Sequence, residues 1–433
     1  MKLAFVNGII LDGTADMEPL YDHVVLVDGE KITAIVPKQD AALTGYKEVD
    51  LKGAYLMPGL INLHLHLALS GKPPKAQKEK PTNYTLLVKL ATKVPGVPAY
   101  YKRMEAGFAK TALMSGVTTM RVVGGVGNFD PSVRNRINKG KAVGPRILTS
   151  AYGVSVPGGH FAGSIATEAK TPEDARRDVR KVHELKPDLI KLMITGGVMD
   201  SSESGEPGAL RMPPEIVKAA CDEAHKLGYY VAAHVESTEG VRVALENGVD
   251  TVEHGSFLDD DLIKLFKEKG AADICTISPA LPYCEFDLSE SKALPIAKEN
   301  GKIVMEGIIE CAKACRENGI PVGLGNDEGC PFIVHYDFWR ELYYYHKYVG
   351  ASNKETLHTA TLGNAKIIGI DDLTGSIEPG KSADLIVTKG NPIEDITVLR
   401  DVSGVCMKGT WYDDPQSQFK KRPEVDALLD KYM

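Results

Sequence analysis

The segment Met57–Gly71, MPGLINLHLHLALSG, is an apolar run that contains two histidines, His64 and His66. Its composition is typical of a buried strand. Alternate residues of a strand share a face, so both imidazoles are predicted to point to one side while the neighbouring leucines pack on the other. Two imidazoles one pleat apart can chelate a metal ion. For an isolated His-X-His pattern, a hydrogen-bonded pair of core histidines is an equal alternative.

Seven further short apolar runs follow this segment and alternate with helical patterns. One such pattern, PPEIVKAACDEAHKLG at residues 213–228, has proline at its start and glycine just past its end, as helices commonly do. Eight strand-helix units over residues 57–362 predict an α/β fold, a (β/α)8 TIM barrel. The seven runs are GVTTMRVVGG, GPRILTSA, DLIKLMITGG, GYYVAAHV, GVDTVEHG, GAADICTIS and GIPVGLGND.

The flanking segments have a different character. Residues 1–56 and 363–415 contain short strand-like runs separated by turn residues. Each segment is too small to close a core alone, so we predict that they combine into one small β-sandwich. Residues 416–433 are predicted to form a C-terminal tail helix.

Composition narrows the class of protein. The chain has 433 residues, 43% of them hydrophobic, and no apolar run approaches the roughly 20 residues of a membrane span. The start of the chain lacks the layout of a signal peptide, which predicts a cytoplasmic location. Seven scattered cysteines without a Cys-X-X-Cys pair favour reduced thiols. A net charge of -7 without a basic stripe gives no reason to expect a nucleic-acid or membrane partner.

Ligand-type residues recur at the ends of the predicted strands. His234 ends YYVAAHV, His254 ends VDTVEHG and Asp327 ends IPVGLGND. Functional groups of such a barrel lie at the C-terminal ends of its strands, so these residues are predicted to meet His64 and His66 at one face. This concentration favours a metal site over packed core histidines.

Lys191 lies inside the apolar run DLIKLMITGG, where an unpaired ammonium group would be costly. One interpretation is an ion pair with an acidic residue on the next strand. The other is that burial lowers its pKa, so that the neutral amine captures carbon dioxide and the carbamate bridges two metal ions. Zinc accepts such a mixture of imidazole nitrogen and carboxylate-like oxygen.

Taken together with GSIEPGKSADLIV after the barrel, these residues make essentially the whole chain resemble the amidohydrolase superfamily. IKLMITGGVMD and STEGVRVALENGVDTVEHG are most similar to the group of imidazolonepropionase-related Xaa-Pro dipeptidases, arginine or lysine carboxypeptidases and ochratoxinase-like amidases. The resemblance implies a carbamylated Lys191, two divalent metal ions and a homo-oligomer. It also implies ligand sets: the more buried metal would take His64, His66 and Asp327, and the more exposed one His234 and His254, with Lys191 bridging both.

The resemblance further implies two catalytic roles. Asp327 would act as general base toward a metal-bridging hydroxide and would later deliver the proton to the leaving amine. His160, in SVPGGHFAG, matches a Gly-Gly-His element of the group and would contact the carbonyl oxygen or a substrate carboxylate. The alternative for this loop histidine is an ordinary surface position.

Departures from the group concern the substrate. RVVGG at residues 121–125 lacks the acidic residue that follows the arginine in the dipeptidases, and Glu236 replaces a Tyr or His that would receive an α-carboxylate. A carboxylate at 236 would repel an α-carboxylate and favour a cation or a hydrogen-bond donor. Arg121, Glu236, Glu328 and Cys330 are the predicted substrate-binding residues beside His160, although Glu328 and Cys330 could equally be simple loop residues.

We therefore predict a binuclear metal-dependent amidohydrolase that cleaves a dipeptide, an N-acyl amino acid or a related small amide. One alternative is a mononuclear cyclic-amidine hydrolase or deaminase similar to imidazolonepropionase, which Lys191 disfavours. A second is a non-catalytic oligomeric scaffold. Such a scaffold commonly loses ligands, whereas all six are present here.

Overall fold

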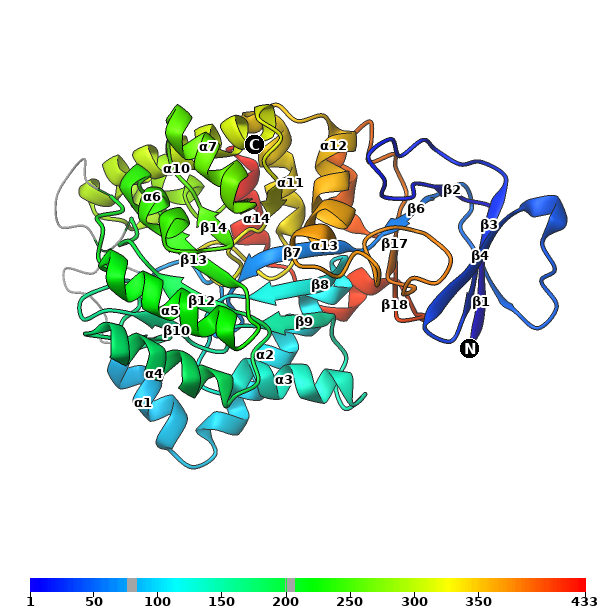
Figure 1. The fold of residues 1–433 in the computed structure, drawn as a ribbon. Helices are drawn as coiled ribbons and strands as arrows, with labels where there is room; N and C mark the ends of the chain where they lie inside the picture. Colours follow the sequence, from blue (N-terminus) through cyan, green and yellow to red (C-terminus); the bar gives the residue numbers. More distant parts are fainter. Residues whose placement is uncertain (76–83, 199, 201–206) are drawn as a thin grey trace.

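The larger part of the protein is a barrel of parallel strands (Figure 1). It is seen in a computed structural model that describes residues 1–75, 84–198, 200 and 207–433. Each barrel strand falls within one of the eight predicted runs, so the predicted (β/α)8 barrel is confirmed. The strands are β7 (Leu60–Leu65), β8 (Val117–Val122), β9 (Arg146–Thr149), β12 (Ile190–Met193), β13 (Val231–Val235), β14 (Thr251–His254), β15 (Ala272–Cys275) and β16 (Val322–Leu324).

Backbone hydrogen bonds close the barrel at two places. Between β9 and β12, the Asp188 amide donates to the Thr149 carbonyl over 2.8 Å. At the seam between β16 and β7, the Asp327 amide donates to the His64 carbonyl and the His66 amide to the Glu328 carbonyl, both over 2.8 Å. The seam therefore passes directly through predicted metal ligands. The short strands β10 (Gly153–Ser155) and β11 (Ala166–Glu168) extend the sheet beside β12.

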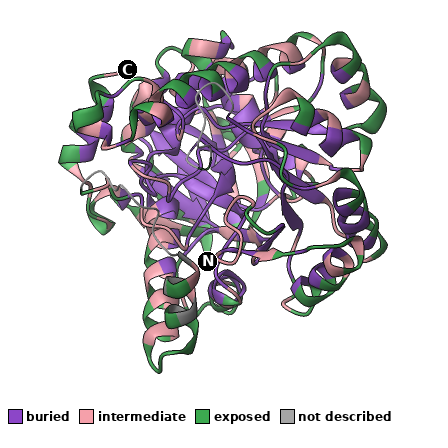
Figure 2. Cartoon of the chain, turned by 90° about the vertical axis from the view of Figure 1, so that its left-hand side faces the viewer, coloured by how far each residue is buried: buried purple, intermediate pink, exposed green. Residues whose placement is uncertain are grey.

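Helices surround the strands. Figure 2 shows buried residues in the middle of the barrel and exposed residues on the outer faces of these helices. Polar caps begin several of them: the side chains of Thr171, Ser237 and Asp259 each accept a backbone amide of the first turn. No helix within the described ranges is long and apolar enough to cross a membrane. The helices are α1 (Tyr84–Lys93), α2 (Val97–Met114), α3 (Phe129–Asn138), α4 (Pro172–His183), α5 (Pro214–Lys226), α6 (Thr238–Glu246), α7 (Asp260–Lys269), α8 (Leu281–Cys284), α9 (Leu288–Ser291), α10 (Pro295–Glu317), α11 (Phe338–Tyr344), α12 (Asn353–His358), α13 (Asn364–Ile367) and α14 (Pro423–Asp430).

Both ends of the chain contribute to the predicted sandwich. One sheet has the order β4-β3-β1-β5 and the other β19-β18-β17-β6-β2. In the second sheet, β6 from the N-terminal segment pairs antiparallel with β17 from the C-terminal segment, beside the barrel in Figure 1. Phe5 and Val25 share a hydrophobic core with Leu385 and Cys406. The strands are β1 (Lys2–Val6), β2 (Ile9–Ile10), β3 (His23–Asp28), β4 (Lys31–Pro37), β5 (Lys47–Asp50), β6 (Tyr55–Pro58), β17 (Leu385–Thr388), β18 (Gly404–Met407) and β19 (Thr410–Asp413).

The composite sandwich is thus confirmed as part of the fold, whereas the exact domain boundaries stay a prediction. Within the predicted tail, residues 416–433, the helix α14 covers Pro423–Asp430. It is held to the barrel by an ion pair of 2.7 Å between the Arg340 guanidinium on α11 and Asp430.

Gly325 is packed tightly against the barrel seam. A Cβ atom there would lie 2.4 Å from the Cβ and 2.5 Å from the backbone nitrogen of His64. We expect Gly325→Ala to lower the free energy of unfolding by about 1–3 kcal/mol, because the backbone must move. Gly107→Ala in α2, where a Cβ meets nothing within 4 Å, is the control and should be neutral or slightly stabilising. Urea unfolding of both variants checks this, and equal stabilities would contradict a tight seam.

Candidate metal centre

Four histidines and one aspartate converge at the C-terminal ends of the barrel strands. The ring centroids of His64 and His254 lie 4.7 Å apart, and those of His234 and His254 lie 4.6 Å apart. His66 is 5.6 Å from His64 by the same measure. Asp327 reaches the pair on β7, with Oδ1 3.2 Å from His66 Nε2 and 3.7 Å from His64 Nε2. All five residues are buried.

The potential ligand atoms form two groups, in each of which all atoms lie within 4.8 Å of one another. The first group is His64, His66 and Asp327, and the second is His234, Glu236 and His254. The histidine and aspartate members fall into the same two sets as the ligands implied by the family resemblance, and their role in metal binding stays a prediction. Glu236 is an addition to the second group, because the sequence marks it as a substrate contact.

Strand alternation directs His64, His66 and His234 into the barrel. It does not explain the other two ligands, because His254 follows the inward-facing Glu253 directly. The backbone of His254 has φ 75° and that of Asp327 has φ 54°, both in the left-handed region. Such a conformation costs of order 1–3 kcal/mol in a residue other than glycine, and it recurs at functional sites as well as in turns. Here it turns two further side chains toward the centre.

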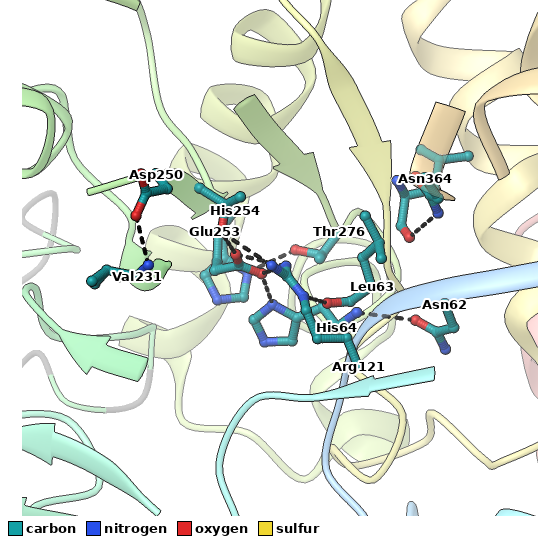
Figure 3. Close-up of polar contacts among 12 residues, drawn as sticks. Asn62, Leu63, His64, Arg121, Val231, Asp250, Glu253, His254, Thr276 and Asn364 are labelled. Carbon is teal, nitrogen blue, oxygen red and sulfur yellow. Dashed lines mark hydrogen bonds and ion pairs between the residues drawn. The ribbon is translucent and has the colours of Figure 1, made fainter. Parts of the chain in front are cut away.

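Glu253 and Arg121 hold His64 in place from the interior of the barrel (Figure 3). Glu253 Oε2 lies 2.7 Å from His64 Nδ1, and the Arg121 guanidinium donates to both oxygens of Glu253 over 2.7 and 2.8 Å. Arg121 also donates to the Leu63 carbonyl. Burial alone would raise the pKa of Glu253, but Arg121 and His64 hold it below its usual value. The carboxylate therefore stays charged and directs Nε2 of His64 toward the centre.

The other ligands are oriented in a similar way. His66 Nδ1 lies 2.8 Å from the Gly124 carbonyl, and His254 Nδ1 lies 2.6 Å from Thr276 Oγ1. Each ring therefore presents Nε2 to the centre. Burial lowers the pKa of His64 to about 4 and holds the pKa of His254 well below its usual value. The lowered pKa values of His64 and His254 favour the neutral ring, which is the form that binds metal ions.

Lys191 lies among the ligands without a partner. The side chain is 1% exposed, and its Nζ has no hydrogen bond to any described residue. Burial lowers its pKa to about 8, although the charge of Glu253 favours the ammonium form. The Lys191 charge in turn lowers the pKa of His64, His234 and His254, as expected for a neighbour of all three. The structure therefore gives no support to the ion-pair interpretation. The lowered pKa favours the neutral amine, which is the form that carbamylation requires.

His160 also belongs to the centre. Its ring stacks on His234 with centroids 4.1 Å apart and planes within 8°. Its Nδ1 contacts the Asp200 carboxylate, which also accepts the Gly197 amide over 2.9 Å. The sequence analysis did not identify Asp200, although it ends the string IKLMITGGVMD that carries the family resemblance.

Two predicted substrate contacts lie at the centre. Burial, together with the charges of Asp200 and Asp327, raises the pKa of Glu236 to about 8. Glu236 Oε2 is buried and has no partner in the described part of the chain. Cys330 is partly exposed and contacts Asp327. Their contact with a substrate stays a prediction.

The other two predicted contacts need correction. Arg121 is fully buried beneath the predicted metal ligands, and its guanidinium donates hydrogen bonds to Glu253 and to neighbouring oxygens. It therefore cannot touch a substrate directly. Glu328 is also fully buried, and its side chain points toward Asn326 and Asp337 instead of the opening. Both residues lie close to site residues in the sequence, but neither side chain reaches the surface of the site.

The sequence pattern that defines the amidohydrolase family matches residues 55–412, which include the whole barrel and every ligand described above. The chain belongs to this family. As an amidohydrolase it is a hydrolase that acts on carbon–nitrogen bonds. The family generally uses divalent metal ions, and the two ligand groups are candidate sites for them.

Individual relatives cover nearly the same length as this amidohydrolase. Ochratoxinase of Aspergillus niger is 27% identical over 430 residues, which cover 92% of this chain and 83% of the fungal protein. The crystal structure of a candidate prolidase from Bifidobacterium longum has a TM-score of 0.85 and 35% identity, and the match covers 99% of this chain and 98% of that one. A Xaa-Pro dipeptidase with bound methionine has a TM-score of 0.82 and 29% identity, over 95% of this chain and all of its own.

Proposed function

We propose that this amidohydrolase cleaves an amide or peptide bond with two divalent metal ions, zinc being the expected metal. One ion would be held by His64, His66 and Asp327, and the other by His234 and His254. Carbamylated Lys191 would link them. The observation that carries the proposal is the buried, unpartnered Lys191 amine among two groups of metal-ligand atoms. Bound metal ions would polarise the scissile carbonyl and lower the pKa of water.

Lys191 would take up carbon dioxide in its neutral form. The Nζ lone pair forms a bond to the carbon of carbon dioxide, the electron pair of one C=O π bond moves to its oxygen, and one proton passes from nitrogen to water. The product carries two oxygens where an ammonium group would otherwise repel cations. This supports a site that binds metal ions only after the lysine has been modified.

Asp327 would accept the proton of the attacking water. Burial would raise its pKa, but the neighbouring His64 and His66 hold the pKa below its usual value, so the carboxylate is available as a base. The same carboxyl group would then pass the proton to the leaving amine. His160, placed on the face of His234, would hydrogen-bond the substrate carbonyl or carboxylate.

Glu236 would select the substrate. Two metal ions bound beside Glu236 would counter the burial that raises its pKa, and the ionised group would repel an α-carboxylate and favour a substrate with a cation or a hydrogen-bond donor there. We therefore favour dipeptides, N-acyl amino acids or related small amides whose recognition does not depend on a free α-carboxylate. The dipeptidase and ochratoxinase among the relatives support this substrate range. The homo-oligomer and the cytoplasmic location stay predictions.

The test uses protein loaded with zinc and bicarbonate and a mixed library of dipeptides, N-acyl amino acids and amino-acid amides. Released products are followed by mass spectrometry. We expect hydrolysis by the wild type and a loss of at least about 10³-fold in Asp327→Asn, since removing the base and a ligand costs several kcal/mol of transition-state stabilisation. Asp222→Asn, on the exposed face of α5, is the control. One metal per chain in an active protein would contradict the proposal and favour the mononuclear alternative.

Glu236→Gln separates the specificity role from the chemistry. The variant keeps size and hydrogen bonding but removes the carboxylate. We expect the preference among library members to move by about tenfold, roughly 1.4 kcal/mol, toward substrates with a free α-carboxylate. Measurement of kcat/KM for matched acid and amide substrates checks this. An unchanged preference would show that Glu236 does not face the substrate.

A further inference from the structure

A second cluster of metal-ligand side chains lies outside the centre, between β15 and α10. It consists of Asp273 on β15 and Cys311 and Cys315 on α10, and the three ligand atoms all lie within 4.8 Å of one another. All three residues are buried. Cys275 follows Asp273 by two residues on β15 and therefore shares its face of the strand. Three of the seven cysteines of the chain thus surround one carboxyl group.

The carboxyl group of Asp273 is not satisfied by these neighbours. Its side chain is fully buried, and Oδ2 has no partner among the residues that the structure describes. Among the described residues, the one hydrogen bond to this carboxyl group comes from the Cys311 thiol, which lies 3.5 Å from Oδ1. A thiol is a weak donor, and a buried carboxyl oxygen without a partner is costly. The carboxyl group therefore retains the capacity to bind a further partner.

The backbone of Gly255 packs directly against the cluster. Gly255 has φ +83°, and a Cβ atom there would lie 2.6 Å from Cys311 Sγ and 2.8 Å from Asp273 Oδ1. Any side chain at this position would thus overlap the ligand atoms. Glycine allows both the left-handed conformation and the close approach.

We propose that Asp273, Cys311 and Cys315 bind a structural zinc ion. Residues four apart on a helix place both sulfurs on one face, where they meet the carboxyl group of Asp273 on the neighbouring strand. Thiolates and a carboxylate are ligands that zinc accepts. Binding displaces the thiol protons and needs no oxidant. The site is independent of the proposed function, because it shares no ligand with the catalytic centre.

The location suggests what the ion would do. Gly255 follows the ligand His254 directly, and Cys275 precedes Thr276, whose hydroxyl lies 2.6 Å from His254 Nδ1 (Figure 3). The residue after β14 and the last residue of β15 thus both lie beside this cluster, and both are next to residues that position His254. A zinc ion behind them would fix β14 and β15 to α10 and restrict the movement of that imidazole.

The first test is absorption spectroscopy of full-length protein loaded with cobalt, which reports thiolate ligation by a charge-transfer band in the near ultraviolet. We expect the band in the wild type and in Cys330→Ser, which removes the one thiol at the catalytic centre. Cys311→Ser and Cys315→Ser should lose it. Cys221→Ser, an equally buried thiol on α5, should keep it. Absence of the band in the wild type, or its loss only in Cys330→Ser, would overturn the proposal.

The second test counts zinc in protein expressed with zinc and then freed of loosely bound metal. The wild type should hold one equivalent more than Cys311→Ser, and a thiol-reactive mercurial should release that equivalent from the wild type. The release needs no variant, so it remains informative if Cys311→Ser fails to fold. Two equivalents in both proteins and no release would reject this site while leaving the catalytic pair, and amide hydrolysis, as proposed.

Discussion

Lys191→Met is expected to lose amide hydrolysis almost completely while the protein stays folded. Methionine fills the same volume but cannot form a carbamate, so the two ligand groups lose the oxygens between them. Several kcal/mol of transition-state stabilisation depend on the metal ions, so kcat/KM should fall by at least about 10³-fold. Stability should not suffer, because the amine that is removed is buried and has no hydrogen bond within the described residues.

Three measurements distinguish this result from general damage. Metal analysis should show fewer bound ions in Lys191→Met, and thermal unfolding should show a stability at least equal to that of the metal-free wild type. Protein equilibrated with 13C-bicarbonate should give a carbamate carbon signal that the variant lacks. Lys226→Met, at the exposed end of α5, should behave as the wild type in all three. Full activity of Lys191→Met would contradict the role of the lysine.

The second large effect is expected at Glu253. Glu253→Gln leaves Arg121 without its counter-charge in the fully buried interior and weakens the contact that orients His64. Breaking one side of a buried ion pair costs about 3–5 kcal/mol. Loss of an outer partner of a metal-bound histidine typically lowers metal affinity or activity by about 10–100-fold. Both losses should therefore appear together.

Urea unfolding and metal titration of the same preparation measure the two effects. Glu355→Gln is the matched control, because Glu355 also accepts two bonds from an arginine, Arg316, but the pair is about one-third exposed. Exposed pairs contribute less than about 1 kcal/mol, and this one is far from the centre. If Glu253→Gln loses stability yet binds metal with unchanged affinity, the role of Glu253 in positioning His64 is wrong.

The sequence predicted the barrel because its strands are short apolar runs separated by well-marked helices. It also singled out Lys191, since a cation inside an apolar strand is conspicuous. Arg121 and Glu253 are equally unusual by that criterion, but the strands that carry them, β8 and β14, are not neighbours in the barrel. Their pairing depends on the curvature of the closed sheet. A linear pattern therefore marks each charge but not its partner.

The direction of some side chains was the second feature that the sequence could not predict. Alternation describes His64 and His66 correctly, although the pairing of β7 with β8 shifts register between Asn62 and Leu65. At His254 and Asp327 the left-handed backbone breaks the alternation, so consecutive residues both face inward. The turn at Asp327 also explains why the prediction of Glu328 as a substrate contact is wrong. Its carbonyl accepts a bond at the barrel seam, and its side chain is directed toward Asn326, away from the opening.

The seam gives the first metal-ligand group a topological meaning. His64 lies near the end of the first barrel strand with His66 just after it, and Asp327 follows the last strand, so the proposed ion would join segments separated by the entire barrel. Joining segments so distant in the chain carries an entropic cost. Metal binding and barrel closure would therefore be one linked equilibrium, in which the ion proposed to support hydrolysis would also stabilise the closed barrel.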